Sequence, residues 1–182
     1  NNEIKEMIKK DFIPTTNFTF INKMDLIILC LPTPIKKNKS PEMLYILNSM
    51  RMIFPYLKEY QTLSLESTTY PGTCEEIIAP ILKKKFNIGK NFFLIYSPER
   101  EDPGNKKYSL LKIPKVIGGF TKKCKLIGQS FYRILGIKLI VVNNIRTAEF
   151  TKLLENIYRS VNIGLINEMK SICSKLNIDI FE

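Results

Sequence analysis

The sequence predicts an α/β fold in which a mostly parallel sheet is followed by one long helix. Short apolar runs of strand length alternate along the chain with helically spaced segments of about 10 to 15 residues. Residues 25–31 form a continuous apolar run, which is typical of a central strand buried on both faces. The final helical pattern, over 146–176, continues without a break.

The predicted strands are short and are separated by turn-forming residues. The first strong one, 25–31, ends at Pro32, because proline cannot donate a ladder hydrogen bond. A weaker strand near 17–21 precedes it, and the others are expected at 62–66, 91–96, 115–118 and 138–142.

The predicted helices follow from apolar residues spaced three or four positions apart. They cover 3–10, 42–57, 72–85, 121–134 and 146–176. The segment 72–85 carries Glu75 and Glu76 in its first turn, where carboxylates favour a helix N-terminus. The last helix would be about 46 Å long, which suggests that it joins domains or pairs subunits.

Composition excludes several classes of protein and of chemistry. The chain has 182 residues, 45% hydrophobic and 25% charged, which excludes a disordered or collagen-like chain. No apolar run approaches the ~20 residues of a membrane-spanning helix. Histidine is absent, so no mechanism that needs a histidine base, nucleophile or metal ligand operates within this sequence.

The four cysteines stand 44 to 50 residues apart, so none falls at metal-binding or redox spacing and we expect no metal site. We interpret them as buried thiols. Together with the polar N-terminus, which lacks an export signal, they predict a cytoplasmic, reducing setting.

The net charge of +11 comes from lysine clusters that lie at the ends of predicted elements. Such charge attracts nucleic acid, an anionic membrane or a phosphate-bearing small molecule. No cluster is interleaved with base-stacking aromatic residues, so we interpret the lysines as solvated surface and expect neither a nucleic-acid nor a membrane partner.

Polar residues follow three of the predicted strands, at the positions where open α/β sheets bind ligands. The segments are 31–34 (LPTP), 66–73 (ESTTYPGT) and 96–105 (YSPEREDPGN), and we expect them to meet at one sheet edge. Each also has a purely structural explanation, as a strand end, a helix cap or a surface turn. On the long helix, Lys152 and Asn156 are four residues apart and share one face.

These segments, together with 147–162 (TAEFTKLLENIYRSVN), closely resemble the UDP-glucose/GDP-mannose dehydrogenase family. The resemblance extends from about residue 16 to 176, and it is strongest to the bacterial UDP-N-acetylglucosamine 6-dehydrogenases. It implies a Rossmann-like sheet, incomplete at its N-terminus. It also implies a domain division into 1–145, a partial NAD-binding domain, and 146–182, the start of a central helical domain.

The resemblance implies NAD-dependent oxidation of the C6 primary alcohol of a UDP-N-acetylhexosamine to a uronic acid in two steps, for surface polysaccharide synthesis. UDP-N-acetylglucosamine is the first choice of substrate, because Pro103 stands where UDP-glucose dehydrogenases carry a second glutamate. UDP-glucose, UDP-N-acetylmannosamine and UDP-N-acetylgalactosamine remain alternatives. A further alternative is a non-catalytic remnant that dimerises through the long helix.

By the same resemblance, Thr33 and Thr68 line the NAD cofactor, and Glu99 helps to activate water for the hydrolytic half of the reaction. Lys152 corresponds to the lysine that stabilises oxyanions during catalysis.

Substrate binding is assigned in the same way. Arg100 begins the loop that holds the nucleotide sugar, and Asn156 corresponds to a sugar-binding asparagine. Family members commonly pair through the long helix, so a homodimer is expected.

Two family motifs are missing from the sequence. One is the Gly-x-Gly-x-x-Gly turn that receives the cofactor pyrophosphate, and the other is the Gly-Gly-His-Cys segment that holds the nucleophilic cysteine. None of the four cysteines stands in a matching context. We therefore expect the chain to be a fragment, and the 182-residue polypeptide by itself to have no dehydrogenase activity.

Overall fold

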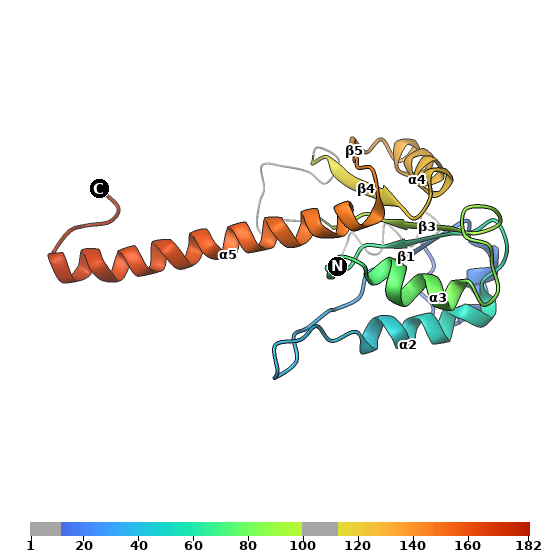
Figure 1. Ribbon diagram of the computed structural model, residues 1–182, viewed down its shortest axis with the longest axis horizontal. Coiled ribbons are helices and arrows are strands. Elements are labelled where there is room, and N and C mark those ends of the chain that lie inside the picture. The colour runs from blue at the N-terminus through green and yellow to red at the C-terminus, as the bar shows by residue number, and fades with distance from the viewer. Residues whose placement is uncertain (1–11, 100–112) are drawn as a thin grey trace.

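The computed structural model describes residues 12–99 and 113–182, and it contains one five-stranded sheet. The strands lie side by side in chain order (Figure 1). They are β1 (Leu26–Leu29), β2 (Thr62–Leu65), β3 (Phe93–Tyr96), β4 (Lys115–Gly119) and β5 (Leu139–Val141). The first three run parallel, β4 is antiparallel to β3, and β5 is parallel to β4. The mostly parallel α/β sheet predicted from the sequence is confirmed.

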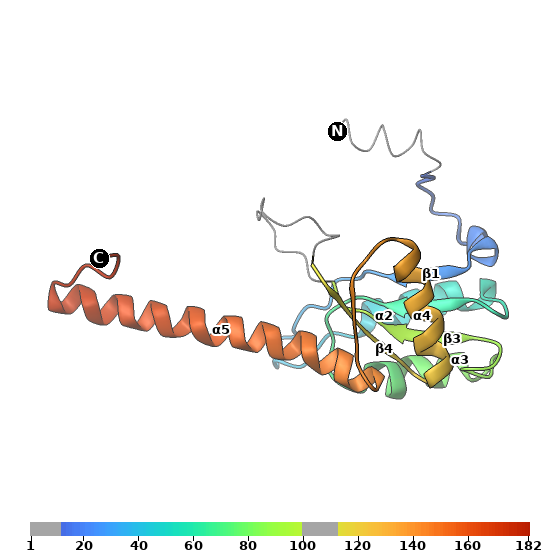
Figure 2. The same cartoon turned by 90° about the horizontal axis from the view of Figure 1, so that it is seen from above.

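Helices cover both faces of the sheet, with α2 and α3 on one face and α4 on the other (Figures 1 and 2). The long helix α5 starts beside β4 and extends well beyond the sheet. The helical elements are η1 (Phe18–Lys23), α2 (Leu44–Ile53), η2 (Phe54–Tyr56), η3 (Cys74–Ile78), α3 (Ala79–Leu82), α4 (Lys122–Ile134) and α5 (Ile145–Leu176).

The strand predicted near 17–21 is wrong, because these residues form the 3-10 helix η1. The side chain of Asn17 accepts a hydrogen bond from the amide of Thr19, which caps the turn and competes with an extended conformation. The helix predicted over 3–10 lies outside the described residues.

The helix predicted over 72–85 begins later and less regularly than its apolar spacing suggests. Gly72 has a φ of 106°, and the π-helical turn η3 precedes the short α3. Pro80 has no amide hydrogen for a regular helical bond and its ring crowds the preceding turn, so a wider turn before it relieves the clash.

The core lies between the sheet and its covering helices, and β2 and β3 are buried along their whole length. α5 packs closely on β4 because Gly118 has no side chain. A Cβ atom at that position would lie 2.7 Å from the carbonyl oxygen of Asn144 and 2.9 Å from Cα of Ile145. Within the described residues, no helix combines the length and apolar character needed to cross a membrane.

Gly118→Ala should destabilise the fold by about 1–3 kcal/mol, because the added methyl group meets backbone atoms at the start of α5. Urea unfolding followed by circular dichroism measures this loss. Gly164→Ala is the control, since nothing lies within 4 Å of that position on α5. It should instead favour the helix by up to about 1 kcal/mol. Equal effects of the two variants would contradict the close packing of α5 on β4.

Candidate functional site

The segments that follow β1 and β2 are tied together by hydrogen bonds at the carboxyl edge of the sheet. The hydroxyl of Thr33 donates to the carbonyl oxygen of Thr68 at 2.7 Å. The amide of Leu31 donates to the hydroxyl oxygen of Ser67, also at 2.7 Å. These bonds place Thr33 and Thr68, the two threonines predicted to line the cofactor, together at one sheet edge. This is expected for residues that follow neighbouring parallel strands.

A cavity of about 320 Å³ opens at this edge. Its lining includes three residues singled out from the sequence: Thr68 after β2, Glu99 after β3 and Lys152 on α5. The remaining lining residues are Cys30, Leu31, Glu66 and Ser67. The cavity therefore combines hydroxyl, carboxylate, thiol and ammonium groups that come from four separate segments of the chain.

Lys152 reaches this cavity because the first turns of α5 are fixed against the loop that follows β2. The helix is capped by Asn144, whose side chain accepts from the amide of Thr147 at 2.8 Å. One turn further on, the buried carboxylate of Glu149 accepts from the amides of Gly72 at 2.5 Å and Cys74 at 2.8 Å. Burial raises the pKa of Glu149, and the two amide hydrogen bonds oppose that rise.

A second cavity, of about 480 Å³, continues along α5 from Lys152. Lys152 and Arg159 give it two cations, and the aromatic ring of Tyr158 lies between them in the sequence. Such a groove suits an anionic ligand that also carries a flat or apolar part. Glu155, Asn162, Ile163 and Ile113 complete the lining.

The cavities include neither of the two predicted substrate-binding residues among their described lining. Asn156 is half-buried on α5, one turn after Lys152, but it lines neither of the two. Arg100 lies outside the described residues.

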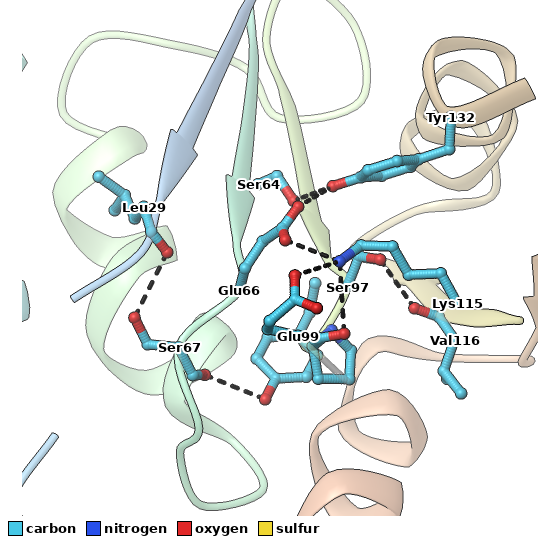
Figure 3. Close-up of polar contacts among 11 residues, drawn as sticks. Leu29, Ser64, Glu66, Ser67, Ser97, Glu99, Lys115, Val116 and Tyr132 are labelled. Carbon is cyan, nitrogen blue, oxygen red and sulfur yellow. Dashed lines mark hydrogen bonds and ion pairs between the residues drawn. The ribbon is translucent and has the colours of Figure 1, made fainter. Parts of the chain in front are cut away.

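A buried polar cluster that sequence reasoning missed lies beside the first cavity (Figure 3). Glu66 accepts from the hydroxyl of Tyr132 through one carboxylate oxygen and from the ammonium of Lys115, at 2.7 Å, through the other. The same ammonium lies 3.5 Å from the carboxylate of Glu99. Glu66 belongs to the segment 66–73 that follows β2, but nothing in the sequence paired it with Lys115.

Cys30 directly follows β1, and its thiol is exposed at the cavity, so the interpretation of all four cysteines as buried thiols is wrong for Cys30. Partial burial raises the pKa of the Cys30 thiol. The carboxylate of Glu66 adds to the rise, the ammonium of Lys115 opposes it, and Glu99 adds to it again. The pKa of the Cys30 thiol therefore depends on the charged groups around the cavity.

The cavity offers hydrogen-bonding groups of the kind that a carboxamide, such as that of nicotinamide, needs. The hydroxyl of Thr68 lines the cavity and can donate or accept, and the carbonyl oxygen of Thr68 keeps a second lone pair beside the Thr33 hydroxyl. Among the described residues, no group of three or more cysteine or carboxylate side chains is arranged to hold a metal ion.

Comparison with known protein families gives two matches. Residues 2–136 match the NAD binding domain of the UDP-glucose/GDP-mannose dehydrogenase family. Residues 146–182 match the central domain of the same family.

Individual relatives agree with this assignment. The chain is 36% identical over 182 residues to a UDP-N-acetyl-D-glucosamine 6-dehydrogenase of Pseudomonas aeruginosa, covering 97% of this chain and 42% of that protein. It is also 36% identical over 166 residues to a UDP-N-acetyl-D-mannosamine dehydrogenase of Escherichia coli, covering 87% and 40%.

Among solved structures, it resembles a UDP-N-acetyl-mannosamine dehydrogenase of Staphylococcus aureus. The TM-score is 0.78 at 36% identity, over 86% of this chain and 39% of that one. The chain thus spans about 40% of the length of these relatives.

Glu99→Gln should raise the alkylation rate of Cys30 by about twofold at pH 8, because removing the negative charge increases the thiolate fraction. The measurement uses a Cys173→Ser background, which removes the other partly accessible thiol. Glu168→Gln, on the exposed outer part of α5, is the matched control and should leave the rate unchanged. If the alkylation rate stays constant or falls in Glu99→Gln, the charge of Glu99 does not act on the Cys30 thiol.

Proposed function

The chain belongs to the UDP-glucose/GDP-mannose dehydrogenase family, and on that premise we propose that it supplies the cofactor-side residues and Lys152 of an enzyme that acts on the C6 primary alcohol of a UDP-N-acetylhexosamine. The proposed reaction is the NAD-dependent, two-step oxidation of this alcohol to the uronic acid. The observation that carries the proposal is the cavity shared by Thr68, Glu99 and Lys152 at the carboxyl edge of the sheet.

The proposed substrate is UDP-N-acetylglucosamine. The relatives at about 36% identity divide between enzymes named for UDP-N-acetylglucosamine and for UDP-N-acetylmannosamine, so the N-acetylated sugar is their common feature. Pro103, in place of a second glutamate, favours the same branch over UDP-glucose. UDP-N-acetylmannosamine is the competing substrate.

When bound, NAD supplies the hydride acceptor for the oxidation. In the proposal, Thr33 and Thr68 orient its nicotinamide end through their linked hydroxyl and carbonyl groups. The ammonium of Lys152 stabilises negative charge on the C6 oxygen as the hydroxyl proton leaves. Glu99 accepts a proton from the water that attacks in the hydrolytic half of the reaction.

The second cavity supports a role in holding the nucleotide part of the substrate. Arg159 supplies positive charge for the diphosphate, and Tyr158 supplies an aromatic surface. Arg100 and Asn156 remain proposed substrate contacts through the family resemblance alone. The proposed domain division, 1–145 and 146–182, puts the threonines in the cofactor domain and Lys152 in the central one.

Pairing of two chains through α5 forms the second part of the proposal. An apolar stripe runs along the outside of this helix at intervals of three or four residues, and all its members are exposed in one chain. They are Phe150, Leu154, Ile157, Val161, Leu165, Met169, Ile172 and Leu176. A second copy of the helix would remove this surface from water.

The four unpaired cysteines are compatible with the cytoplasmic setting that we propose.

Isothermal titration calorimetry tests the substrate proposal on the 182-residue chain. UDP-N-acetylglucosamine should bind more tightly than UDP-N-acetylmannosamine. Lys152→Met should weaken binding about tenfold, because a charged contact is lost. Lys170→Met, on the exposed outer part of α5, is the matched control and should bind like the unaltered chain. A dimeric chain without any nucleotide-sugar binding would favour the non-catalytic alternative.

Light scattering after size exclusion tests the pairing. The unaltered chain should have twice the 21.1 kDa mass of one copy. Leu165→Glu should give monomers, because it places a charge within the apolar stripe. Asn167→Glu, two positions along the same helix and off the stripe, should remain dimeric. A monomeric unaltered chain, or equal masses for both variants, would contradict pairing through this stripe.

A further inference from the structure

We propose that Lys115 is a positioning residue, whose ammonium group holds the carboxylate of Glu99 at the first cavity while the buried Glu66 anchors that ammonium. The inference rests on the proposed function of Glu99. It assigns a role to Lys115 that the family resemblance did not supply.

Lys115 reaches the carboxyl edge because β4 runs antiparallel to β3. The pairing places Ile95 opposite Gly119 and Tyr96 opposite Gly118. The same register, continued past the end of β3, places Glu99 opposite Lys115. The first residue of β4 therefore lies beside the loop after β3, where the functional side chains gather.

The ammonium of Lys115 contacts three acceptors. It lies 2.7 Å from Oε2 of Glu66, 3.4 Å from the carbonyl oxygen of Pro98 and 3.5 Å from Oε2 of Glu99 (Figure 3). The lysine side chain is 11% exposed and that of Glu66 is 6% exposed, whereas that of Glu99 is 48% exposed. Glu99 is thus the most exposed member of the group.

Glu66 is fixed from both sides. Tyr132 donates its hydroxyl to the other carboxylate oxygen, and that hydroxyl lies 2.9 Å from the hydroxyl of Ser64. The Lys115 nitrogen also lies 5.6 Å from the centre of the Tyr132 ring. These partners fix the ammonium of Lys115, so the Glu99 carboxylate lies near a positive charge whose position does not change.

Two carboxylates at one edge repel each other unless a cation lies between them. The backbone amide of Glu99 donates to the carbonyl oxygen of Glu66 at 3.3 Å, so the two residues are held close. Without the ammonium, repulsion by the Glu66 carboxylate would favour turning the half-exposed side chain of Glu99 toward water. Lys115 therefore keeps the Glu99 carboxylate at the cavity, where the proposed hydrolytic step needs it.

The Cys30 thiol reports this positioning because it lines the same cavity and its pKa responds to Glu99. The pKa of the thiol is measured from the pH dependence of its alkylation in a Cys173→Ser background. Glu66 is kept in every variant, because its carboxylate anchors Lys115 and repels Glu99 in the proposal. Lys152, which also lines this cavity, stays unchanged throughout.

The experiment compares the effect of Glu99→Gln with Lys115 intact and with Lys115→Met. With Lys115 intact, Glu99→Gln should raise the alkylation rate of Cys30 by about twofold. In the Lys115→Met background the same change should have almost no effect, because Glu99 has already left the cavity. Lys115→Arg should restore the twofold effect.

An equal effect of Glu99→Gln in both backgrounds would overturn the proposal. Circular dichroism checks that each variant is folded, and Lys115→Gln replaces Lys115→Met if the apolar side chain prevents folding. The assay contains neither NAD nor a nucleotide sugar. A negative result in this assay therefore argues only against the positioning role of Lys115. If Lys115 still controls the effect of Glu99→Gln but the chain binds no nucleotide sugar, only the proposed function is contradicted.

Discussion

The reversed direction of β4 is the constraint on which the charges of the candidate site depend. In a fully parallel sheet, the first residue of every strand lies at the edge opposite the ligand-binding one. Because β4 is antiparallel to β3, its first residue, Lys115, lies at the carboxyl edge instead. Its ammonium lets Glu66 be buried there and lets Glu99 lie nearby without strong repulsion.

A second constraint joins the sheet to the long helix. Glu149 is fully buried, and burial of a carboxylate is unfavourable unless its oxygens are hydrogen-bonded. The amides of Gly72 and Cys74 meet this need, and they belong to the segment that follows Thr68. The same contact therefore fixes the distance between the proposed cofactor side and Lys152, which lies one helical turn further along.

The sequence was informative wherever a local pattern determines structure. Apolar runs predicted the strands. Because the carboxyl ends of parallel strands lie at one sheet edge, strand order and direction were enough to predict that the segments of Thr33 and Thr68 would meet. The position of Lys115 was not predictable, because side-chain periodicity does not encode whether a strand runs parallel or antiparallel. The strand expected near 17–21 failed because the cap formed by Asn17 outweighs the apolar pattern of a short segment.

The most direct test of the account is an amide NMR titration of the chain with UDP-N-acetylglucosamine. A site at this edge predicts shift changes concentrated on 31–34, 66–73 and 97–99 and on the middle of α5, from Lys152 to Ile163. Inorganic diphosphate is the reference for simple charge attraction. Shift changes that both ligands share, confined to the lysine cluster of 83–85, would contradict a nucleotide-sugar site at the carboxyl edge of the sheet.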